Sequence, residues 1–182
     1  MKKIIILGST GSIGKTLINI INKDKKNFEI VLLTVNKNIK ELYKQIAKFN
    51  VKNIIITNQK EYLIALRKLK NKKVNIYNNF DSINKILKNK KIDYSINAIS
   101  GIAGLEPTLK IIKSTKTIAI ANKEAIICGW SLIKKELKKN KTHFIPVDSE
   151  HFSIWSLINN AKNLDIEKVF LTASGGPFSN YP

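Results

Sequence analysis

The chain has 182 residues, of which 43% are hydrophobic, and this is enough to form the core of one domain, or of one domain and the beginning of a second. The composition excludes a disordered tail, and the single cysteine, Cys128, excludes a disulfide-stapled mini-protein. The apolar run that follows Met-Lys-Lys stops at Gly8 and is too short for a secretion signal or a membrane span. We therefore expect a cytoplasmic protein with no membrane partner.

The charge is strongly positive, with 32 lysine and arginine residues against 13 aspartate and glutamate residues and a net charge of +19. Such a charge favours nucleic-acid binding. However, Arg67 is the only arginine, although arginine is preferred for recognition of phosphates and bases, and the lysines are spread through almost every polar stretch. We interpret the charge as a solvated surface and expect no nucleic-acid partner. A basic nucleic-acid-binding protein is the alternative from another class.

Short β-branched runs alternate with longer segments of helical period, which is the pattern of βαβ units and a mainly parallel sheet. Strands are predicted at Lys3–Leu7, Glu29–Val35, Asn53–Thr57, Val74–Tyr77, Tyr94–Ala98, Thr117–Ile120, His143–Pro146 and Val169–Ala173. Helices are predicted at Ser12–Asn22, Ile39–Phe49, Glu61–Lys70, Ser82–Lys88, Glu106–Lys113 and Lys123–Lys139. The predicted fold class is α/β, a Rossmann-like, mainly parallel sheet flanked by helices.

Three glycines, Gly8, Gly11 and Gly14, follow the first predicted strand and lead into the first predicted helix. Glycines allow a tight turn and a close approach of the backbone to a diphosphate, whose charge is favoured at a helix N-terminus. This context predicts a dinucleotide site, with a plain strand-to-helix turn or another nucleotide's loop as the alternatives. The second predicted strand ends near Lys37 without an acidic residue, which favours the 2′-phosphate of NADPH; the alternative is that Lys37 is one more surface lysine.

A polar cluster of Asn122, Lys123 and Glu124 follows the predicted strand Thr117–Ile120. The carboxyl end of a strand is where open α/β sheets bind ligands. The same residues also suit a helix start, because Asn is a preferred cap and an acid is favoured in the first turn. Spacing alone leaves both interpretations open.

Asp148 and Glu150 follow the predicted strand His143–Pro146 and, in an extended segment, would project to the same side. Two carboxylates placed in this way suit a hard cation such as Mg²⁺ or Mn²⁺. The alternative is a polar loop in which Ser149 caps a following helix. We interpret the neighbouring His151 as a bystander.

The last predicted strand opens into a glycine turn at Ser174, where backbone N–H groups and the hydroxyl could bind a phosphate. An ordinary turn is the alternative. The βα pattern loosens after Pro146, which marks the predicted domain boundary. The chain stops at Pro182, directly after this turn, and we expect it to be an incomplete piece of a longer protein.

Four motifs, in this order and at these intervals, closely resemble the 1-deoxy-D-xylulose 5-phosphate reductoisomerase family over the whole chain. They are Gly8-Ser-Thr-Gly-Ser-Ile-Gly14, Ala121-Asn-Lys-Glu124, Pro146-Val-Asp-Ser-Glu-His151 and Ser174-Gly-Gly-Pro-Phe178. The resemblance implies an oxidoreductase that converts 1-deoxy-D-xylulose 5-phosphate to 2-C-methyl-D-erythritol 4-phosphate in non-mevalonate isoprenoid biosynthesis. The implied cofactors are NADPH and a divalent cation, Mg²⁺ or Mn²⁺, with Co²⁺ as a further option.

The resemblance also implies roles for individual residues. Cofactor contacts are implied for Thr10, Gly11, Ser12, Ile13, Lys37, Asn38, Asn122 and Glu124. Metal ligation is implied for Asp148 and Glu150, and substrate contacts for Lys123, Ser149, Glu150 and Ser174. Asp148, Glu150 and Lys123 are the implied catalytic residues. Asn36 departs from the glycine usual in the family.

The implied domains are an NADPH-binding Rossmann-like domain at 1–147 and the beginning of an α+β catalytic domain at 148–182. Family members continue for roughly as many residues again and form homodimers, so we expect the chain alone to bind NADPH without turnover. A rival within enzymes is another NADP-dependent Rossmann dehydrogenase. It would keep the glycine loop but would not need the pair formed by Asp148 and Glu150.

Overall fold

Seven parallel strands form one sheet in the computed structural model, which describes residues 1–159 and 166–170. The strands are β1 (Lys2–Leu7), β2 (Phe28–Val35), β3 (Asn53–Ile56), β4 (Asn75–Tyr77), β5 (Ile92–Asn97), β6 (Thr115–Ile120) and β7 (His143–Pro146). They lie in the order β4-β3-β2-β1-β5-β6-β7, and each neighbouring pair is parallel. The predicted α/β class with a Rossmann-like sheet is confirmed.

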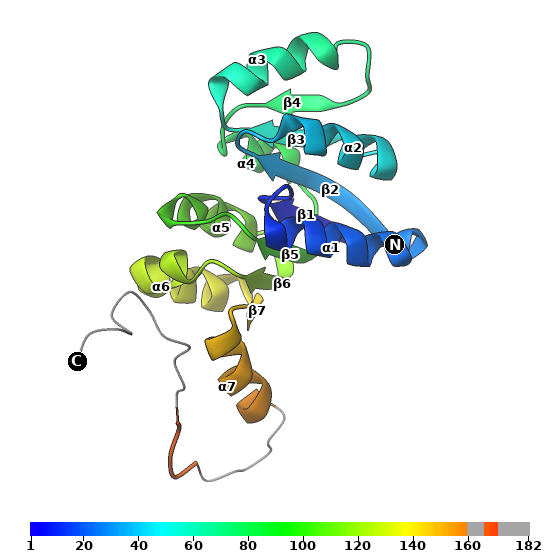
Figure 1. Ribbon diagram of the computed structural model, residues 1–182. Coiled ribbons are helices and arrows are strands. Elements are labelled where there is room, and N and C mark those ends of the chain that lie inside the picture. Colours follow the sequence, from blue (N-terminus) through cyan, green and yellow to red (C-terminus); the bar gives the residue numbers. More distant parts are fainter. Residues whose placement is uncertain (160–165, 171–182) are drawn as a thin grey trace, which may run out of the picture.

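Helices cover both faces of this sheet (Figure 1). They are α1 (Ser12–Lys23), α2 (Ile39–Phe49), α3 (Gln59–Lys68), α4 (Ser82–Ile86), α5 (Leu105–Ile112), α6 (Lys123–Asn140) and α7 (Ser149–Asn159), with short 3₁₀ turns η1 (Lys25–Asn27) and η2 (Ile102–Gly104). Helices α1, α2 and α3 pack on one face, and α4, α5 and α6 pack on the other. Helix α7 extends away from the β7 edge (Figure 1).

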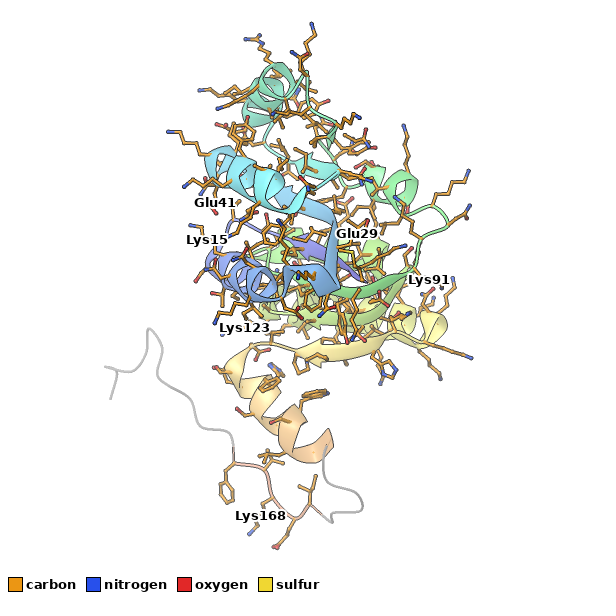
Figure 2. The ribbon with its side chains drawn as sticks, turned by 90° about the vertical axis from the view of Figure 1, so that its right-hand side faces the viewer. Lys15, Glu29, Glu41, Lys91, Lys123 and Lys168 are labelled. Carbon is orange, nitrogen blue, oxygen red and sulfur yellow. The ribbon has the colours of Figure 1, made fainter. Side chains whose placement is uncertain are left out.

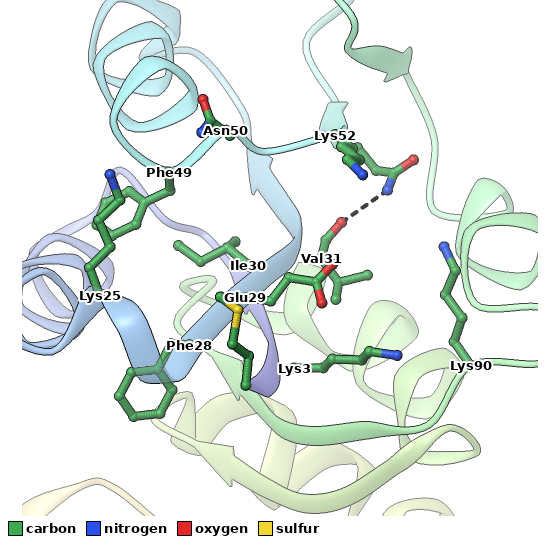
Figure 3. A pocket seen from close by; sticks show the side chains of 12 residues that line it. Lys3, Lys25, Phe28, Glu29, Ile30, Val31, Phe49, Asn50, Lys52 and Lys90 are labelled. Carbon is green, nitrogen blue, oxygen red and sulfur yellow. Dashed lines mark hydrogen bonds between the residues drawn. The ribbon is translucent and has the colours of Figure 1, made fainter.

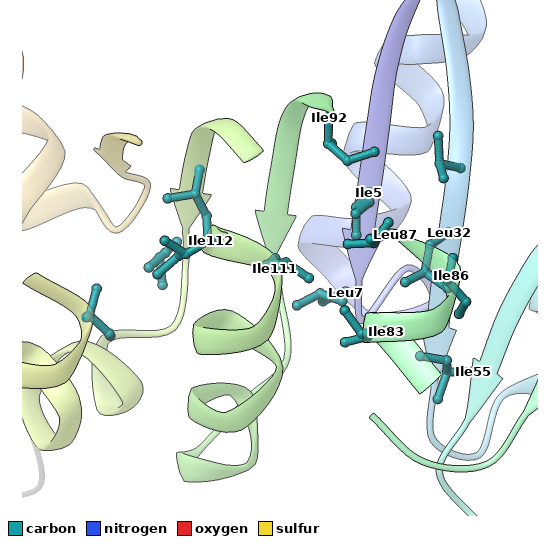
Figure 4. Close-up of a cluster of buried hydrophobic side chains, with 14 of the residues drawn as sticks. Ile5, Leu7, Leu32, Ile55, Ile83, Ile86, Leu87, Ile92, Ile111 and Ile112 are labelled. Atoms are coloured by element: carbon teal, nitrogen blue, oxygen red, sulfur yellow. The ribbon is translucent and has the colours of Figure 1, made fainter. Parts of the chain in front are cut away.

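The core divides into two layers because side chains alternate across each strand. In β1, Ile5 and Leu7 are fully buried against α4 and α5, in the layer drawn in Figure 4. Ile4 and Ile6 of the same strand are buried in the other layer, against α1 and α2. A strand buried on both faces reads as a continuous apolar run, as β1 does.

The predicted strands and helices up to Pro146 lie within two residues of the observed bounds. The structure decides between the two alternatives for the segment after Pro146: Asp148 and Glu150 do not lie in an extended segment, because α7 begins at Ser149. The physical reason is a helix cap, since the Asp148 carboxylate accepts the His151 N–H at 3.0 Å. Of the predicted strand Val169–Ala173, the first two residues have no regular structure, and the rest lies outside the described residues.

The buried position of Ile5 in the central strand makes it a test of this core. We expect Ile5→Ala to lower the free energy of unfolding by about 2–5 kcal/mol and Ile5→Val by about 1 kcal/mol, because each leaves a cavity. Urea unfolding measures both values. The control is Ile20→Ala on α1, since Ile20 is 57% exposed and its truncation creates no cavity. Equal losses at Ile5 and Ile20 would contradict the assignment of the core.

Lysine side chains point outward from well-separated parts of the molecule. Figure 2 labels Lys15 near the start of α1, Lys91 before β5 and Lys123 at the start of α6. Among the described residues, no helix is long and apolar enough to cross a membrane.

Candidate functional site

The glycine loop lies between β1 and α1, at the strand where the order of the sheet reverses, because β1 is flanked by β2 and β5. Gly8 has a φ of +77°, and a Cβ there would lie 2.7 Å from the Ala98 carbonyl oxygen. A Cβ on Gly14 would lie 2.4 Å from the Gly8 carbonyl oxygen. Both positions therefore require glycine for the tight turn and the close packing of α1 on the loop.

Helix α1 begins at this loop without a cap. No side chain caps its Gly11 N-cap position, and its first turn contains no acidic residue. In contrast, α2, α3 and α6 each have an Asn cap and a glutamate in the first turn. The N–H groups and the positive dipole end of α1 thus remain available to an anion such as a diphosphate.

Two buried polar residues hold the glycine loop in place. The Gly8 N–H donates to Thr34 Oγ1 at 2.9 Å, and the Ser9 N–H donates to the Thr34 carbonyl oxygen at 3.0 Å. Gln45 of α2, which is 2% exposed, donates from Nε2 to the Ser9 carbonyl oxygen at 3.0 Å. Sequence reasoning missed Thr34 and Gln45, although a glutamine between Leu42 and Ile46 on the apolar side of α2 was a possible signal.

The first cavity, of about 730 Å³, opens between the glycine loop and the end of β2. Of the residues predicted for the cofactor, Thr10, Gly11, Lys37 and Asn38 line it. The Asn38 side chain also caps α2, since its Oδ1 accepts the Glu41 N–H at 3.2 Å. Gly8, Thr34 and Thr57 lie in the same wall. Asn36 turns its amide to Thr57 Oγ1 at 2.8 Å, within this cavity's lining.

The second cavity, of about 390 Å³, lies at the carboxyl ends of β5, β6 and β7. It brings together most of the remaining predicted residues: Ile13, Asn122, Lys123, Glu124, Asp148, Ser149 and Glu150. Ala98, Ile99 and Ser100 line both cavities. The two cavities therefore adjoin along one edge of the sheet, with the glycine loop at one end and the two carboxylates at the other.

Asp148 is the more enclosed of the two carboxylates, with a side chain that is 9% exposed. Its Oδ1 accepts the His151 N–H and contacts His151 Nδ1, while its buried Oδ2 has no hydrogen-bond partner among the described residues. His151, expected to be a bystander, thus holds Asp148 in place. An enclosed carboxylate oxygen without a hydrogen-bond partner is compatible with coordination of a cation.

Glu150 lies in the first turn of α7, is half-buried and lines the second cavity. Its own backbone N–H lowers the pKa of the Glu150 carboxyl, as do the Ser149 hydroxyl and the charge of Lys123. The Ser149 hydroxyl donates to Glu150 Oε2 at 2.9 Å. Over residues 1–159 and 166–170, no three His, Cys, Asp or Glu side chains are grouped to hold a metal. Asp148 and Glu150 line the same cavity.

Asn122 bears out the helix-start interpretation of its cluster. Its Oδ1 caps α6 by accepting the Ala125 N–H at 2.8 Å, and Glu124 is the acid of the first turn. The ligand-binding interpretation is compatible with this cap, because Asn122, Lys123 and Glu124 also line the second cavity. The predicted phosphate contact, Ser174, lies outside the described residues.

A further cavity, of about 520 Å³, lies at the amino ends of the strands, opposite the first two cavities, and none of the predicted site residues lines it. Figure 3 shows Lys3, Lys52 and Lys90 around its rim, with Glu29 between them. The C-termini of α1 and α2 lie at this edge, where helix dipoles favour cations.

The contacts of Asp148 predict its titration. Burial would raise the pKa of the Asp148 carboxyl, but the hydrogen bonds and the charge of His151 hold this pKa below its ordinary value. Asp148 should therefore stabilise α7 fully above the unfolded-state pKa of about 3.9, and this contribution should be lost as the pH falls through the lower folded pKa. Carboxyl-carbon NMR measures the midpoint. In His151→Ala we expect the pKa to rise, and a wild-type midpoint above the ordinary value would contradict the contact.

A parallel sheet with a glycine loop at the point where its strand order reverses defines a Rossmann-like α/β protein. Residues 4–129 match the family model described as 1-deoxy-D-xylulose 5-phosphate reductoisomerase, and residues 144–182 match the model of that enzyme's C-terminal domain. The chain therefore belongs to the 1-deoxy-D-xylulose 5-phosphate reductoisomerase family.

Individual relatives agree with this assignment. The chain is 66% identical over 181 residues to the 1-deoxy-D-xylulose 5-phosphate reductoisomerase of Pelagibacter ubique (strain HTCC1062), covering 99% of this chain and 47% of the relative. It resembles the Zymomonas mobilis enzyme solved in complex with NADPH, with a TM-score of 0.75 and 31% identity, over 82% of this chain and 39% of that one. A DOX-P reductoisomerase solved with NADPH, fosmidomycin and magnesium gives a TM-score of 0.78 at 28% identity, over 86% of this chain and 38% of that one. The chain spans about half the length of the curated relatives it matches.

Proposed function

We propose that the protein to which this chain belongs converts 1-deoxy-D-xylulose 5-phosphate to 2-C-methyl-D-erythritol 4-phosphate, with NADPH and a divalent cation, in isoprenoid biosynthesis. The observation that carries the proposal is the pair of adjoining cavities, with an uncapped helix start at one end and two carboxylates at the other. A simple dehydrogenase has no use for the carboxylates. Family membership and the NADPH and magnesium complexes of related structures support the same activity.

NADPH fits the first cavity and the loop beside it. Gly8 and Gly14 leave no space for a Cβ, so the loop backbone can approach a diphosphate closely. In the proposal, Thr10, Gly11, Ser12 and Ile13 bind the diphosphate, and Lys37 with Asn38 binds the 2′-phosphate. Lys37 lines the cavity where an NADH enzyme would offer a carboxylate to the ribose.

A divalent cation fits the second cavity, because hard cations prefer carboxylate oxygens and Asp148 Oδ2 has no partner. Asp148 and Glu150 would hold it, and Mg²⁺, Mn²⁺ or Co²⁺ are the candidates. When bound, the cation supplies Lewis-acid polarisation of the substrate's carbonyl and hydroxyl oxygens. His151 keeps Asp148 oriented and charged for this task through its hydrogen bonds.

The chain's own groups orient the phosphosugar in this proposal. Lys123 lies close enough to Glu150 to lower the pKa of that carboxyl, so its ammonium group can attract an anionic substrate oxygen into the same cavity. Ser149 presents a hydroxyl there, and Asn122 and Glu124 form the wall toward the nicotinamide side. Ser174 is proposed to bind the substrate phosphate.

We also propose the domain division expected from the sequence, with the NADPH-binding part at 1–147 and the start of the catalytic part at 148–182. It also includes a homodimer of the longer protein, supported by the family resemblance, and a cytoplasmic location, with which a single cysteine is consistent. Light scattering of the longer protein tests the dimer.

Turnover tests the proposed activity. We expect the longer protein to oxidise NADPH only when 1-deoxy-D-xylulose 5-phosphate and Mg²⁺ or Mn²⁺ are both present, with 2-C-methyl-D-erythritol 4-phosphate identified by NMR. The 182-residue chain should bind NADPH with negligible turnover. Metal-independent reduction of an unrelated substrate would instead favour another dehydrogenase. Salt-dependent nucleic-acid binding without NADPH affinity would favour the basic binding protein.

A further inference from the structure

The segment from Ala98 to Ser100 is the shared wall of the two cavities. It leaves the carboxyl end of β5 and enters η2 through Gly101, which has a φ of +71°. Its backbone also packs on the glycine loop, since Gly8 lies so close to Ala98 that a Cβ would collide with the Ala98 carbonyl oxygen. A ligand that occupies both cavities must pass along this wall.

Asn97 fixes the wall from the sheet side. It is the last residue of β5 and is fully buried. Its Oδ1 accepts the Ile99 N–H at 3.0 Å, and its Nδ2 donates to the Gly104 carbonyl oxygen at 3.1 Å and to Thr108 Oγ1 at 2.7 Å. Every hydrogen-bonding group of this amide is therefore used to hold the segment between β5 and α5.

Asn122 fixes the same wall from the α6 side and is 4% exposed. Its Nδ2 donates to the carbonyl oxygens of Ile99 and Gly101, while its Oδ1 caps α6 at the Ala125 N–H. Both Nδ2 hydrogens are thus taken by the chain. The side chain has no free donor with which to contact a cofactor.

The two amides meet at Gly104. A Cβ on Gly104 would lie 2.6 Å from Asn122 Nδ2 and 2.9 Å from Asn97 Nδ2. The close fit of both asparagines around one glycine couples β5, the wall and the start of α6 into one unit. This arrangement joins residues 25 positions apart in the chain, so no local pattern in the sequence predicts it.

We propose that Asn97 and Asn122 are positioning residues that hold the wall from Ala98 to Ser100 in the shape required by a dinucleotide crossing from the first cavity to the second. The inference rests on the proposed function, because it assumes that NADPH occupies both cavities. It gives Asn122 a different role from the cofactor contact implied by the family resemblance. Asn122 acts on the cofactor through the wall rather than through its own amide.

Asn122→Ser removes the hydrogen bonds of this side chain to the wall and retains its role as the cap of α6. Serine is also a good cap, so α6 keeps its first-turn hydrogen bond, but a serine hydroxyl cannot replace two amide donors to Ile99 and Gly101. We expect the dissociation constant for NADPH, measured by fluorescence titration of the purified protein, to rise about tenfold. Hydrogen exchange of the backbone amides from Ile99 to Gly104 should accelerate, while the first turn of α6 stays protected.

Asn58→Ser is the matched control. Asn58 caps α3 by accepting the Glu61 N–H at 3.1 Å and lines neither cavity. It makes the same exchange of one capping side chain for another, and should leave NADPH affinity unchanged. If Asn122→Ser fails to fold, Asn122→Thr provides the same test, because threonine is also a neutral helix cap and lacks the two amide donors.

The possible results distinguish a failure of the positioning role from a failure of the proposed function. A wild-type protein that does not bind NADPH overturns both. A wild-type protein that binds NADPH, together with an Asn122 variant whose affinity is within twofold of wild type despite faster exchange in the wall, overturns only the positioning role. An equal loss of NADPH affinity in Asn58→Ser would show that the effect comes from general instability. This result would also overturn the positioning role.

Discussion

Gly14→Ala should weaken NADPH binding by about ten- to a hundredfold, the largest effect that we expect from a single methyl group in this protein. A Cβ at this position would lie 2.4 Å from the Gly8 carbonyl oxygen and 2.7 Å from the Ser9 carbonyl carbon. Because these atoms belong to the backbone, the collision cannot be relieved by a side-chain rotation. The loop must move away from α1, and its N–H groups then no longer converge on the diphosphate. Fluorescence titration with NADPH measures the loss.

Gly129→Ala in α6 is the control for this substitution. Gly129 is also a buried helical glycine, and its Cβ would lie 2.3 Å from Leu105 Cδ1, the end of a flexible side chain. We expect Gly129→Ala to lower thermal stability and to leave NADPH affinity unchanged. Comparable NADPH affinity in wild type and Gly14→Ala would contradict the glycine loop as the diphosphate site.

Asp148→Asn should reduce the affinity for Mn²⁺ by at least about tenfold, because it removes an anionic oxygen while retaining the size of the side chain. Asparagine also remains an acceptable cap for α7, so the fold around the site should persist. Glu150→Gln should have a similar effect, because it removes the second carboxylate that lines the cavity. Electron paramagnetic resonance of free Mn²⁺ in the presence of the protein measures both affinities.

Asp81→Asn is the matched control for the metal test. Asp81 is an exposed carboxylate beside α4 that pairs with Lys110 and lines neither cavity. It removes the same charge from the molecule, so any general electrostatic effect appears in it equally. Equal losses of Mn²⁺ affinity in Asp81→Asn and Asp148→Asn would reject the assignment of the metal site.

The sheet and its helices were predictable because the signals are local. The β-branched run of β1 and the alternation of later strands and helices required no knowledge of distant contacts. Helix α7 was only an alternative at the level of sequence, because Phe152, Trp155 and Leu157 do not form one apolar stripe and the polar run after Pro146 resembles a loop. The sequence pattern named Ser149 as the residue that caps this helix, whereas Asp148 caps it in the structure.

The site residues that come directly after the ends of strands were predictable from the sequence. The glycine loop and the clusters at Asn122 and Asp148 were found because parallel strands bring their carboxyl ends to one edge. The residues that support them were not found, since the contact of Gln45 with Ser9 joins positions 36 apart, and that of Asn122 with Ile99 joins positions 23 apart. Such pairs are set by the packing of helices on the sheet. The roles of individual site residues, Ser174 among them, stay predictions.

A crystal structure of the protein with NADPH and Mn²⁺ tests the central claim most directly. We predict the nucleotide diphosphate at the N-terminus of α1, the nucleotide extended past Ala98 into the second cavity, and Mn²⁺ on the carboxylates of Asp148 and Glu150. Nucleotide bound instead at the opposite edge of the sheet, among Lys3, Lys52 and Lys90, or Mn²⁺ bound away from both carboxylates, would contradict the account.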